Sequence, residues 1–418
     1  MNLCKKKPHI PELRRRDLLR LLWTACTLVL VAGMVIYPQI VFEGAAAGLK
    51  AWWNIVFPSL LPFFIASELL TNFGVVHFMG ILLEPVMRPL FNVPGAGSFV
   101  VAVGYTSGYP IGSMVTAKLR SRGLCTRVEA ERLISFTNNS SPLFMLVAVA
   151  VGMFDNASLG VIIAGAHYLA NLTIGLGLRF YAHRDTERIP GPSAARTGLV
   201  SRAFNTMLQV QREDGRPLGR IMGEAVRNSI TNLLNIGGFI IFFAVFIKML
   251  TAAGIIETLA GCLGIFLLPL GFSPEILPAL ASGIFEMTIG SKLASEAAAP
   301  LLQQVVAVGM ILAWSGLSVH AQVASMISET DIRIRPFVIS RAAHACLAGI
   351  YTCIAYKWAE PPEALAVTAA GAVQAASFSW LSLKMFGFFI ALLAVLILLA
   401  LLYHLAGSLK LLVFKKIL

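Results

Sequence analysis

Two acidic residues stand inside apolar stretches of the chain, where a charged side chain is costly. Glu286 lies in the run IFEMTIG (284–290), and Glu68 lies in FFIASELL (63–70). An ionisable group in the middle of a membrane segment costs at least ~2.5–3.5 kcal/mol on insertion scales. We therefore expect Glu286 to bind an ion, a proton or a substrate, or else to form a structural ion pair with Lys292 or an arginine of another helix. Glu68 lies nearer a segment end, so it is either a second ligand or a side chain that reaches the membrane interface.

Glycine, proline and small polar residues gather in two pairs of stretches. GYTSGYPIG (104–112) pairs with GIFEMTIGS (283–291), and NNSSP (138–142) pairs with WSGLS (314–318). Helix breaks at membrane depth are tolerated only inside the protein or beside a water-filled cavity, and paired breaks indicate a transporter's binding site. With the two acids, the predicted substrate- or ion-binding residues are Thr288, Ser107, Gly108, Asn138, Asn139, Ser140, Ser141, Ser315, Ser318 and His320. The alternative is that small residues merely let helices pack closely.

The remaining polar residues of the apolar segments have structural interpretations. His167, His344 and His320 are expected to form hydrogen bonds between helices, and a proton-relay role is left open. TRVEAERL (126–133) is typical of an amphipathic cytoplasmic helix capped by Thr126, with its charged side chains paired along one face.

Composition places all these residues in a membrane protein. The 418 residues are 13% charged and 57% hydrophobic, with a mean hydropathy of +0.78, whereas a soluble domain has about 25% charged residues. The apolar residues form runs near 20 residues long, the length that spans a bilayer. These runs lie at 18–41, 44–73, 76–92, 97–119, 133–154, 157–181, 228–252, 255–271, 276–295, 301–327, 334–356 and 378–406. The fold class is therefore an all-α, polytopic membrane bundle of about 8–12 transmembrane segments, with the lipid bilayer as its main partner.

Several function classes are excluded by the sequence. The net charge of +12 lies in short segments between apolar runs, so it indicates loops beside anionic lipid and not nucleic-acid binding. The six cysteines have no CxxC spacing, and neither a disulfide framework nor a metal site is expected. No phosphate-binding loop, nucleophile elbow or zinc-protease motif occurs in the sequence. We expect no enzyme activity and no cofactor.

The basic residues predict the orientation of the chain in the membrane. Of the 33 Lys and Arg residues, 27 fall in five groups at 1–20, 118–132, 179–227, 329–341 and 410–416. One arrangement puts all five groups on the cytoplasmic side, with both termini there. The opposite loop, 358–377, has two Glu residues and no Lys or Arg.

Weak internal similarity divides the chain into two halves. At a shift of 178 residues Gly112-Ser113 falls on Gly290-Ser291, and at 177 Ala166-His167 falls on Ala343-His344. Five segments per half would invert the second copy, as in many secondary transporters. The predicted units are a cytoplasmic N-terminus with the first helix (1–41), a first repeat (42–181), a cytoplasmic linker (182–219), a second repeat (220–357), an external loop (358–377) and a C-terminal helix with a basic tail (378–418).

The same residues resemble a known family. The run from GYTSGYPIGS to LVAVAVGMF (104–154), with FPSLLPFFIASELL (57–70) and GIFEMTIGSKLA (283–294), is similar to sporulation integral membrane proteins of the YlbJ type. That family is similar in turn to a group sharing a nucleoside-recognition, or Gate, domain. The resemblance implies a spore-forming bacterium, a sporulation-related cytoplasmic membrane, and two Gate-like repeats with a substrate near their broken helices. It implies no particular substrate.

Three functions follow as hypotheses. The first is a transporter-like sporulation protein that moves a small polar solute or ion through a site on two inverted repeats. The second is a non-transporting membrane scaffold needed for spore-envelope (cortex or coat) assembly. The third, a membrane enzyme, lacks a paired nucleophile and base in the sequence. Either of the first two is compatible with a homo-oligomer.

Overall fold

The computed structural model describes residues 15–182, 187 and 198–359. The basic stretch before residue 15, much of the predicted linker, nearly all of the predicted external loop and the C-terminal helix 378–418 lie outside these residues. Every regular element within the described residues is helical. The predicted all-α class is therefore confirmed.

The first half of the chain consists of short helices joined by breaks. Its elements are α1 (Arg15–Ile36), α2 (Pro38–Ala51), the π-helix η1 (Trp52–Val56), α3 (Phe57–Asn72), α4 (Val75–Phe91), α5 (Gly97–Ser107), α6 (Ile111–Ser121), α7 (Arg127–Thr137), the π-helix η2 (Phe144–Val151) and α8 (Ala157–Leu178). Several boundaries follow from local chemistry. Asn156 accepts the Ser158 N–H at the start of α8, and Thr126 and Glu129 form a capping box at the start of α7.

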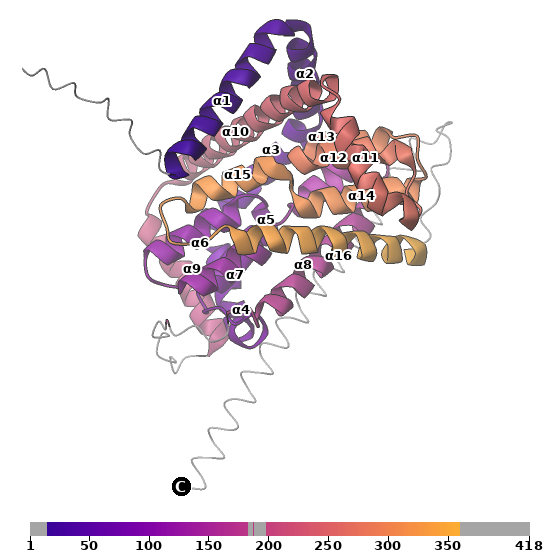
Figure 1. Ribbon diagram of the computed structural model, residues 1–418. Coiled ribbons are helices and arrows are strands. Elements are labelled where there is room, and N and C mark those ends of the chain that lie inside the picture. The colour runs from indigo at the N-terminus through magenta and orange to yellow at the C-terminus, as the bar shows by residue number, and fades with distance from the viewer. Residues whose placement is uncertain (1–14, 183–186, 188–197, 360–418) are drawn as a thin grey trace, which may run out of the picture.

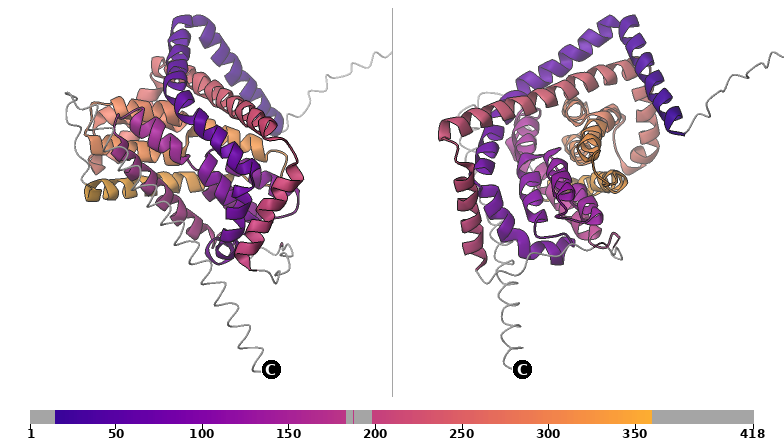
Figure 2. Two further views of the ribbon diagram at one scale, coloured as in Figure 1. Left: turned by 180° about the vertical axis from the view of Figure 1, so that it is seen from behind. Right: turned by 90° about the vertical axis from the view of Figure 1, so that its left-hand side faces the viewer.

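The second half repeats this order of helices. Its elements are α9 (Leu199–Asp214), α10 (Leu218–Ala252), α11 (Ile255–Leu267), the 3₁₀ turns η3 (Leu268–Leu270) and η4 (Pro274–Ile276), α12 (Leu277–Phe285), α13 (Met287–Glu296), α14 (Leu301–Trp314), α15 (Gly316–Ile327) and α16 (Arg335–Ala359). Figure 1 shows α1, α2 and α10 along one side of the molecule, beside the bundle that contains α5–α8 and α12–α16. Figure 2 shows α9 meeting the start of α10 at an angle.

Four helical stretches among the described residues are long and apolar enough to cross a membrane. They are 157–178, 218–252, 301–327 and 335–359, and the bent pair 21–36 and 38–54 would make a fifth. The other apolar segments predicted from the sequence form shorter or interrupted helices. The chain is a multi-pass membrane protein in which the helices around the core are discontinuous.

Glycines with a positive φ angle mark the same junction in each half. Gly74 (φ 73°) separates α3 from α4, and Gly254 (φ 72°) separates α10 from α11. Glycine adopts this left-handed conformation without a Cβ clash. The segment α2–η1–α3 covers residues 38–72, and its counterpart α10 is a single helix of 35 residues. The π-helical turn in the first half is therefore a local difference between matching elements.

Matching helices of the two halves also touch each other at matching residues. The rings of His167 on α8 and His344 on α16 lie 4.6 Å apart, and Thr173 lies 3.2 Å from the Tyr351 hydroxyl at a sequence separation of 178. Trp52 donates to the Leu233 carbonyl at 2.9 Å, a separation of 181 residues. Contacts between equivalent positions are what a local two-fold relation produces. The core lies around these contacts and includes residues of η2, α8, α12 and α14.

Candidate functional site

The first predicted break occurs between α5 and α6. Gly108 ends α5 with φ 80°, and a Cβ there would lie 2.9 Å from the Ser141 Cβ and 3.0 Å from the Ser141 nitrogen. Glycine is therefore required on both counts, backbone conformation and space. The two predicted break segments of the first half thus meet at Gly108 and Ser141.

The second break places Glu286 at the start of α13. Glu286 has an extended backbone (φ −146°), and one carboxylate oxygen accepts the Ile289 N–H at 2.7 Å. The residue is 3% exposed. In the first half the corresponding amide, of Ser113 in α6, donates to the side chain of Asn138 at 3.1 Å. The same helix-start requirement is thus met by a neutral amide in one half and by a carboxylate in the other.

The ion-pair alternative for Glu286 has no support among the described residues. Lys292 pairs with Glu296 at 2.6 Å, four residues along α13. Within the described ranges no ion pair involves Glu286. Its carboxylate faces neutral groups, and one of its oxygens accepts a backbone N–H.

The NNSSP break is fixed by hydrogen bonds to neighbouring helices. Asn138 donates to Ser113 Oγ at 2.6 Å and to the Ile134 carbonyl at 2.7 Å, and the Ser140 N–H donates to His167 Nε2 at 3.3 Å. Tyr168 donates to the Ser140 carbonyl at 3.0 Å. The bonds with His167 and Tyr168 satisfy the backbone N–H and carbonyl of Ser140, as the interior of a membrane protein requires.

The WSGLS break is built differently. Ser315 ends α14 in a left-handed conformation (φ 71°), and Gly316 follows with φ 76°. A Cβ on Gly316 would lie 3.0 Å from the Glu286 Cα. This contact brings the two breaks of the second half together, as Gly108 and Ser141 do in the first.

All four breaks border one cavity of about 60 Å³. Seven of the twelve predicted site residues line it: Ser107, Gly108, Ser140, Ser141, Glu286, Thr288 and Ser318. The starts of α13 and α15 and the segments before α6 and η2 contribute to the wall. Helix N-termini carry partial positive charge and free N–H groups, so the wall can bind polar groups of a solute.

The other five predicted residues lie outside the lining. Asn138 and Asn139 are fully buried behind Ser140, Ser315 is buried at the α14–α15 junction, and His320 hydrogen-bonds the Gly316 carbonyl oxygen at 2.7 Å. Glu68 is half-buried in α3. The breaks thus combine residues that face the cavity with residues that hold those in place.

The structure adds two polar cavity residues that the sequence analysis did not select. Tyr109 lies between Gly108 and Pro110, inside a stretch already identified as a break, and its hydroxyl donates to the Leu312 carbonyl at 3.1 Å. Gln322 lies on α15 one turn after Ser318. The i, i+4 spacing of Ser318 and Gln322 is a signal that could have found it.

Arg341 corrects one part of the charge analysis. It was counted with the basic loop residues, yet it is completely buried on α16. Its guanidinium donates to the carbonyls of Ser135 and Asn138, to Asn171 Oδ1 at 3.1 Å and to the Tyr109 hydroxyl at 3.3 Å. A cation beside the carboxyl end of α7 is favoured by the helix dipole.

The helix α7 is a second correction. TRVEAERL was expected to form an amphipathic cytoplasmic helix, but residues 128–137 are all buried. Its acidic side chains pair with basic residues of other elements, Glu129 with Arg88 and Glu131 with Arg333. The capping box at Thr126 is as predicted.

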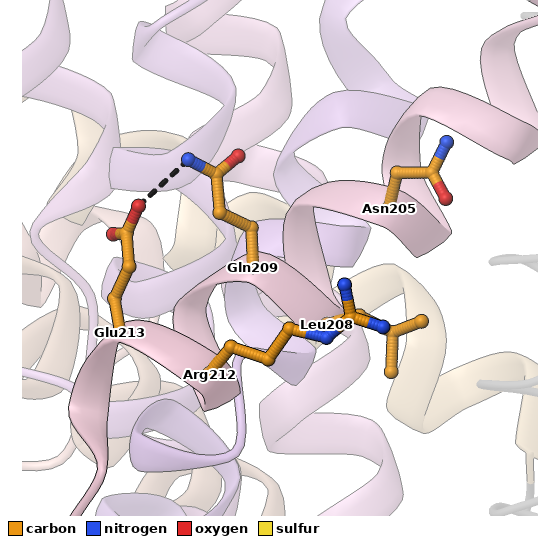
Figure 3. Close-up of a pocket in the computed structure, with 5 residues that line it drawn as sticks. All are labelled: Asn205, Leu208, Gln209, Arg212 and Glu213. Atoms are coloured by element: carbon orange, nitrogen blue, oxygen red, sulfur yellow. Dashed lines mark hydrogen bonds between the residues drawn. The ribbon is translucent and has the colours of Figure 1, made fainter.

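A larger hollow of about 440 Å³ lies elsewhere and is formed by one helix only. It borders α9 at Asn205, Leu208, Gln209, Arg212 and Glu213, and Figure 3 shows the hydrogen bond from Gln209 to Glu213 along that helix. Four of these residues are exposed. A hollow on one exposed helix with an internally paired glutamate is a weaker candidate than the cavity that the breaks of both halves border.

Comparisons with known proteins agree with a membrane role. A family model described as nucleoside recognition matches residues 54–166. The sporulation integral membrane protein YlbJ of Bacillus subtilis (strain 168) is 46% identical over 343 residues, covering 80% of this chain and 83% of that protein. An uncharacterized protein of Alkalihalophilus pseudofirmus is 31% identical over 147 residues, 32% of this chain and 31% of its own length. A solved structure described as CNTnw in an inward-facing substrate-bound state aligns over 85% of this chain and 88% of its own, with 13% identity and a TM-score of 0.42.

Proposed function

The chain belongs to the family of the sporulation integral membrane protein YlbJ, and from that premise we propose that it moves a small polar solute or ion across a membrane. The observation that carries this proposal is Glu286, a 3%-exposed acid in the wall of a cavity bordered by the breaks of both halves. A carboxylate is costly inside a membrane protein and is retained there where it binds something. Thr288, Ser141 and Ser318 would supply neutral hydrogen bonds to the same solute.

The second candidate is a non-transporting scaffold for spore-envelope assembly. One observation favours it, the small volume of the cavity. A cavity of about 60 Å³ holds a dehydrated ion or a few water molecules, because about 10–15 Å³ measured in this way is enough for one water. A larger solute requires the halves to separate. A scaffold does not.

Filling the cavity distinguishes the two functions. Ser318→Leu adds apolar volume to the wall, and Ser325→Leu makes the same change at an exposed position of the same helix. Purified wild-type protein is screened by thermal shift against nucleosides, amino acids, small carboxylates and inorganic ions. Each variant is then tested with any solute that stabilises the wild type, and for spore formation in a host that lacks its own copy.

We expect only Ser318→Leu to lose both the solute-dependent shift and spore formation. Normal spore formation by Ser318→Leu at a normal protein level would contradict transport through this cavity and favour the scaffold. If both variants lose spore formation, the added leucine itself is the cause, and filling of the cavity is not.

The proposed orientation places both termini and the segment 182–219 in the cytoplasm. It is supported by the clustering of basic residues. Single cysteines in 198–219 should react with an impermeant reagent only from the cytoplasmic side, and single cysteines in 358–377 only from the opposite side. Labelling of 358–377 from the cytoplasm would contradict the inverted arrangement of the halves.

A further inference from the structure

An ion pair between the two halves covers one end of the bundle. Arg333, in the loop after α15, binds the carboxylate of Glu131 on α7 through two nitrogens, at 2.7 and 3.0 Å. The Glu131 side chain is fully buried and also accepts the Tyr181 hydroxyl at 2.8 Å. Two parallel N–H···O bonds fix both distance and orientation. This contact therefore holds the second half against the first.

A second ion pair lies beside it. Arg120, at the end of α6, binds both carboxylate oxygens of Asp331 at 2.8 Å, and it also binds Glu187 at 2.7 Å. The same guanidinium donates to the Cys125 carbonyl at 3.0 Å. We call the pairs Arg333–Glu131 and Arg120–Asp331 the latch. Both pairs join a loop of the second half to a helix of the first.

An apolar layer separates the latch from the cavity. One hydrophobic cluster contains Tyr109 and Val319, which line the cavity, and Cys125 and Ile332, which adjoin the latch. Ile134, Val323, Ile327 and Phe337 belong to the same cluster. A solute leaving the cavity in this direction would meet first an apolar layer and then the two ion pairs.

The opposite end of the bundle lacks an equivalent. A shift of 178 residues maps Arg120 onto Ala298, just after α13, and Glu131 onto Gly309 on α14. It maps Asp331 and Arg333 onto the segment 152–156 that follows η2. Among the described residues there, Lys292 and Glu296 pair with each other within α13, and no ion pair links 152–156 to Ala298 or Gly309. Elsewhere in the described part of the chain, the exposed side chains of Lys248 and Glu43 join the halves by a longer ion pair of 4.0 Å, so the two-nitrogen contact of the latch has no counterpart at the matching positions.

We propose that the latch and its apolar layer form a gate that closes the cavity toward the face carrying the basic loops. In the orientation proposed above, this face is cytoplasmic. The role of the gate in transport rests on the proposed function. Whether the gate opens and closes can be tested without any solute. Opening it requires the two ion pairs to part and the layer around Cys125 to separate.

The native Cys125 is a reporter inside the gate. It is fully buried, and replacing Cys4, Cys26, Cys262, Cys346 and Cys353 by serine leaves it as the only thiol. The gate is weakened by combining Arg333→Gln with Asp331→Asn, which leaves Glu131 its Tyr181 partner. The matched control is Arg220→Gln, which removes an exposed pair with Glu224 on α10. The rate of reaction with N-ethylmaleimide is measured on purified full-length protein in detergent, where both faces are accessible.

We expect Cys125 to react about tenfold faster in the weakened protein, equivalent to about 1.4 kcal/mol, and at the wild-type rate in the control. A second reporter, Ser318→Cys in the same background with Cys125 also replaced by serine, should show the same acceleration because it lies in the cavity. A third, Ala225→Cys, is fully buried on α10 and should keep its slow rate.

Unchanged rates at Cys125 and Ser318→Cys would overturn the gate. So would acceleration at Ala225→Cys, because the variant would then have loosened the whole protein. Faster reaction at Cys125 but not at Ser318→Cys would show that the ion pairs cover Cys125 without controlling access to the cavity. That result would also overturn the gate. The labelling assay contains no solute. Its result therefore does not depend on whether the Ser318→Leu experiment supports transport.

Discussion

Glu286→Gln tests whether the buried acid serves binding or folding. The substitution keeps the shape of the side chain and keeps one carbonyl oxygen, and it removes the charge. In the structure the carboxylate accepts the Ile289 N–H at 2.7 Å, and the amide oxygen of glutamine can accept the same bond. The cap at the start of α13 should therefore persist.

The expected change in stability is small. Losing the charge at a helix N-terminus costs about 0.3–1 kcal/mol, and up to ~2 kcal/mol where the site is buried. The unfavourable burial of a carboxylate is removed at the same time and offsets part of this loss. We expect the free energy of unfolding to fall by less than about 1.5 kcal/mol. A broken buried ion pair would instead cost about 3–5 kcal/mol.

The expected change in function is large. Hydrogen bonds to a charged group contribute about 1.5–3 kcal/mol, which corresponds to roughly a 10- to 150-fold loss of affinity for a solute or ion held by the carboxylate. Spore formation, the yield of folded protein and the unfolding midpoint in detergent are measured for the variant. The control is Glu296→Gln, which makes the same change at an exposed ion pair on the same helix.

Three results are informative. Normal yield with defective spores supports a binding role. Loss of folded protein would show that the charge is structural. Normal yield with normal spores would refute both interpretations of Glu286.

Three further predictions concern the surroundings of the site. Arg341→Met removes four hydrogen bonds to buried acceptors, and we expect a loss of about 3 kcal/mol in the free energy of unfolding, measured by thermal denaturation; an unchanged midpoint would refute the role assigned to this network. Gly290→Ala would place a Cβ 2.4 Å from the facing backbone of α12, so it should destabilise by about 1–3 kcal/mol, whereas Gly261→Ala on α11 meets nothing within 4 Å and should be neutral or stabilising. Hydrogen bonding from Arg120 lowers the pKa of Asp331, so this pair stabilises the protein above the ordinary pKa of an aspartate and is lost as the pH falls below it. The difference in unfolding midpoint between wild type and Asp331→Asn should therefore shrink between pH 7 and pH 3, and a constant difference would contradict the ion pair.

The breaks were predictable because their cause is local. Gly108 and Gly316 occupy positive-φ positions, and Asn, Ser and Pro at 138–142 compete with helical hydrogen bonding. The polytopic all-α class was equally predictable, because apolar runs near 20 residues long reflect the thickness of a bilayer. The internal shift of about 178 residues also anticipated which breaks correspond, and His167 and His344 now lie in contact.

Other features depend on which segments meet in space. Arg341 reads as a loop charge in the sequence, and only packing shows that it is buried against the end of α7. The stretch 126–133 was predicted to be amphipathic, yet partners from elsewhere in the chain cover the side chains of Glu129 and Glu131. Which break residues face the cavity depends likewise on side-chain direction, so Ser141 lines it while Asn139 lies behind.

The sequence by itself determined that the protein lies in a lipid bilayer, that it is helical and where its helices break. It also determined that an acid, costly to bury in a membrane, lies at one of the breaks. Each is a property of a short stretch of chain and of the free energy of placing it in lipid. Only the tertiary structure decided that the four breaks share one cavity, that Arg341 is internal, and that two ion pairs join the halves at one end. The breaks of each half meet across about 30 positions of sequence, and the ion pairs and the contacts of Arg341 with α7 span about 200. The sequence of a single chain carries no local signal for any of these contacts.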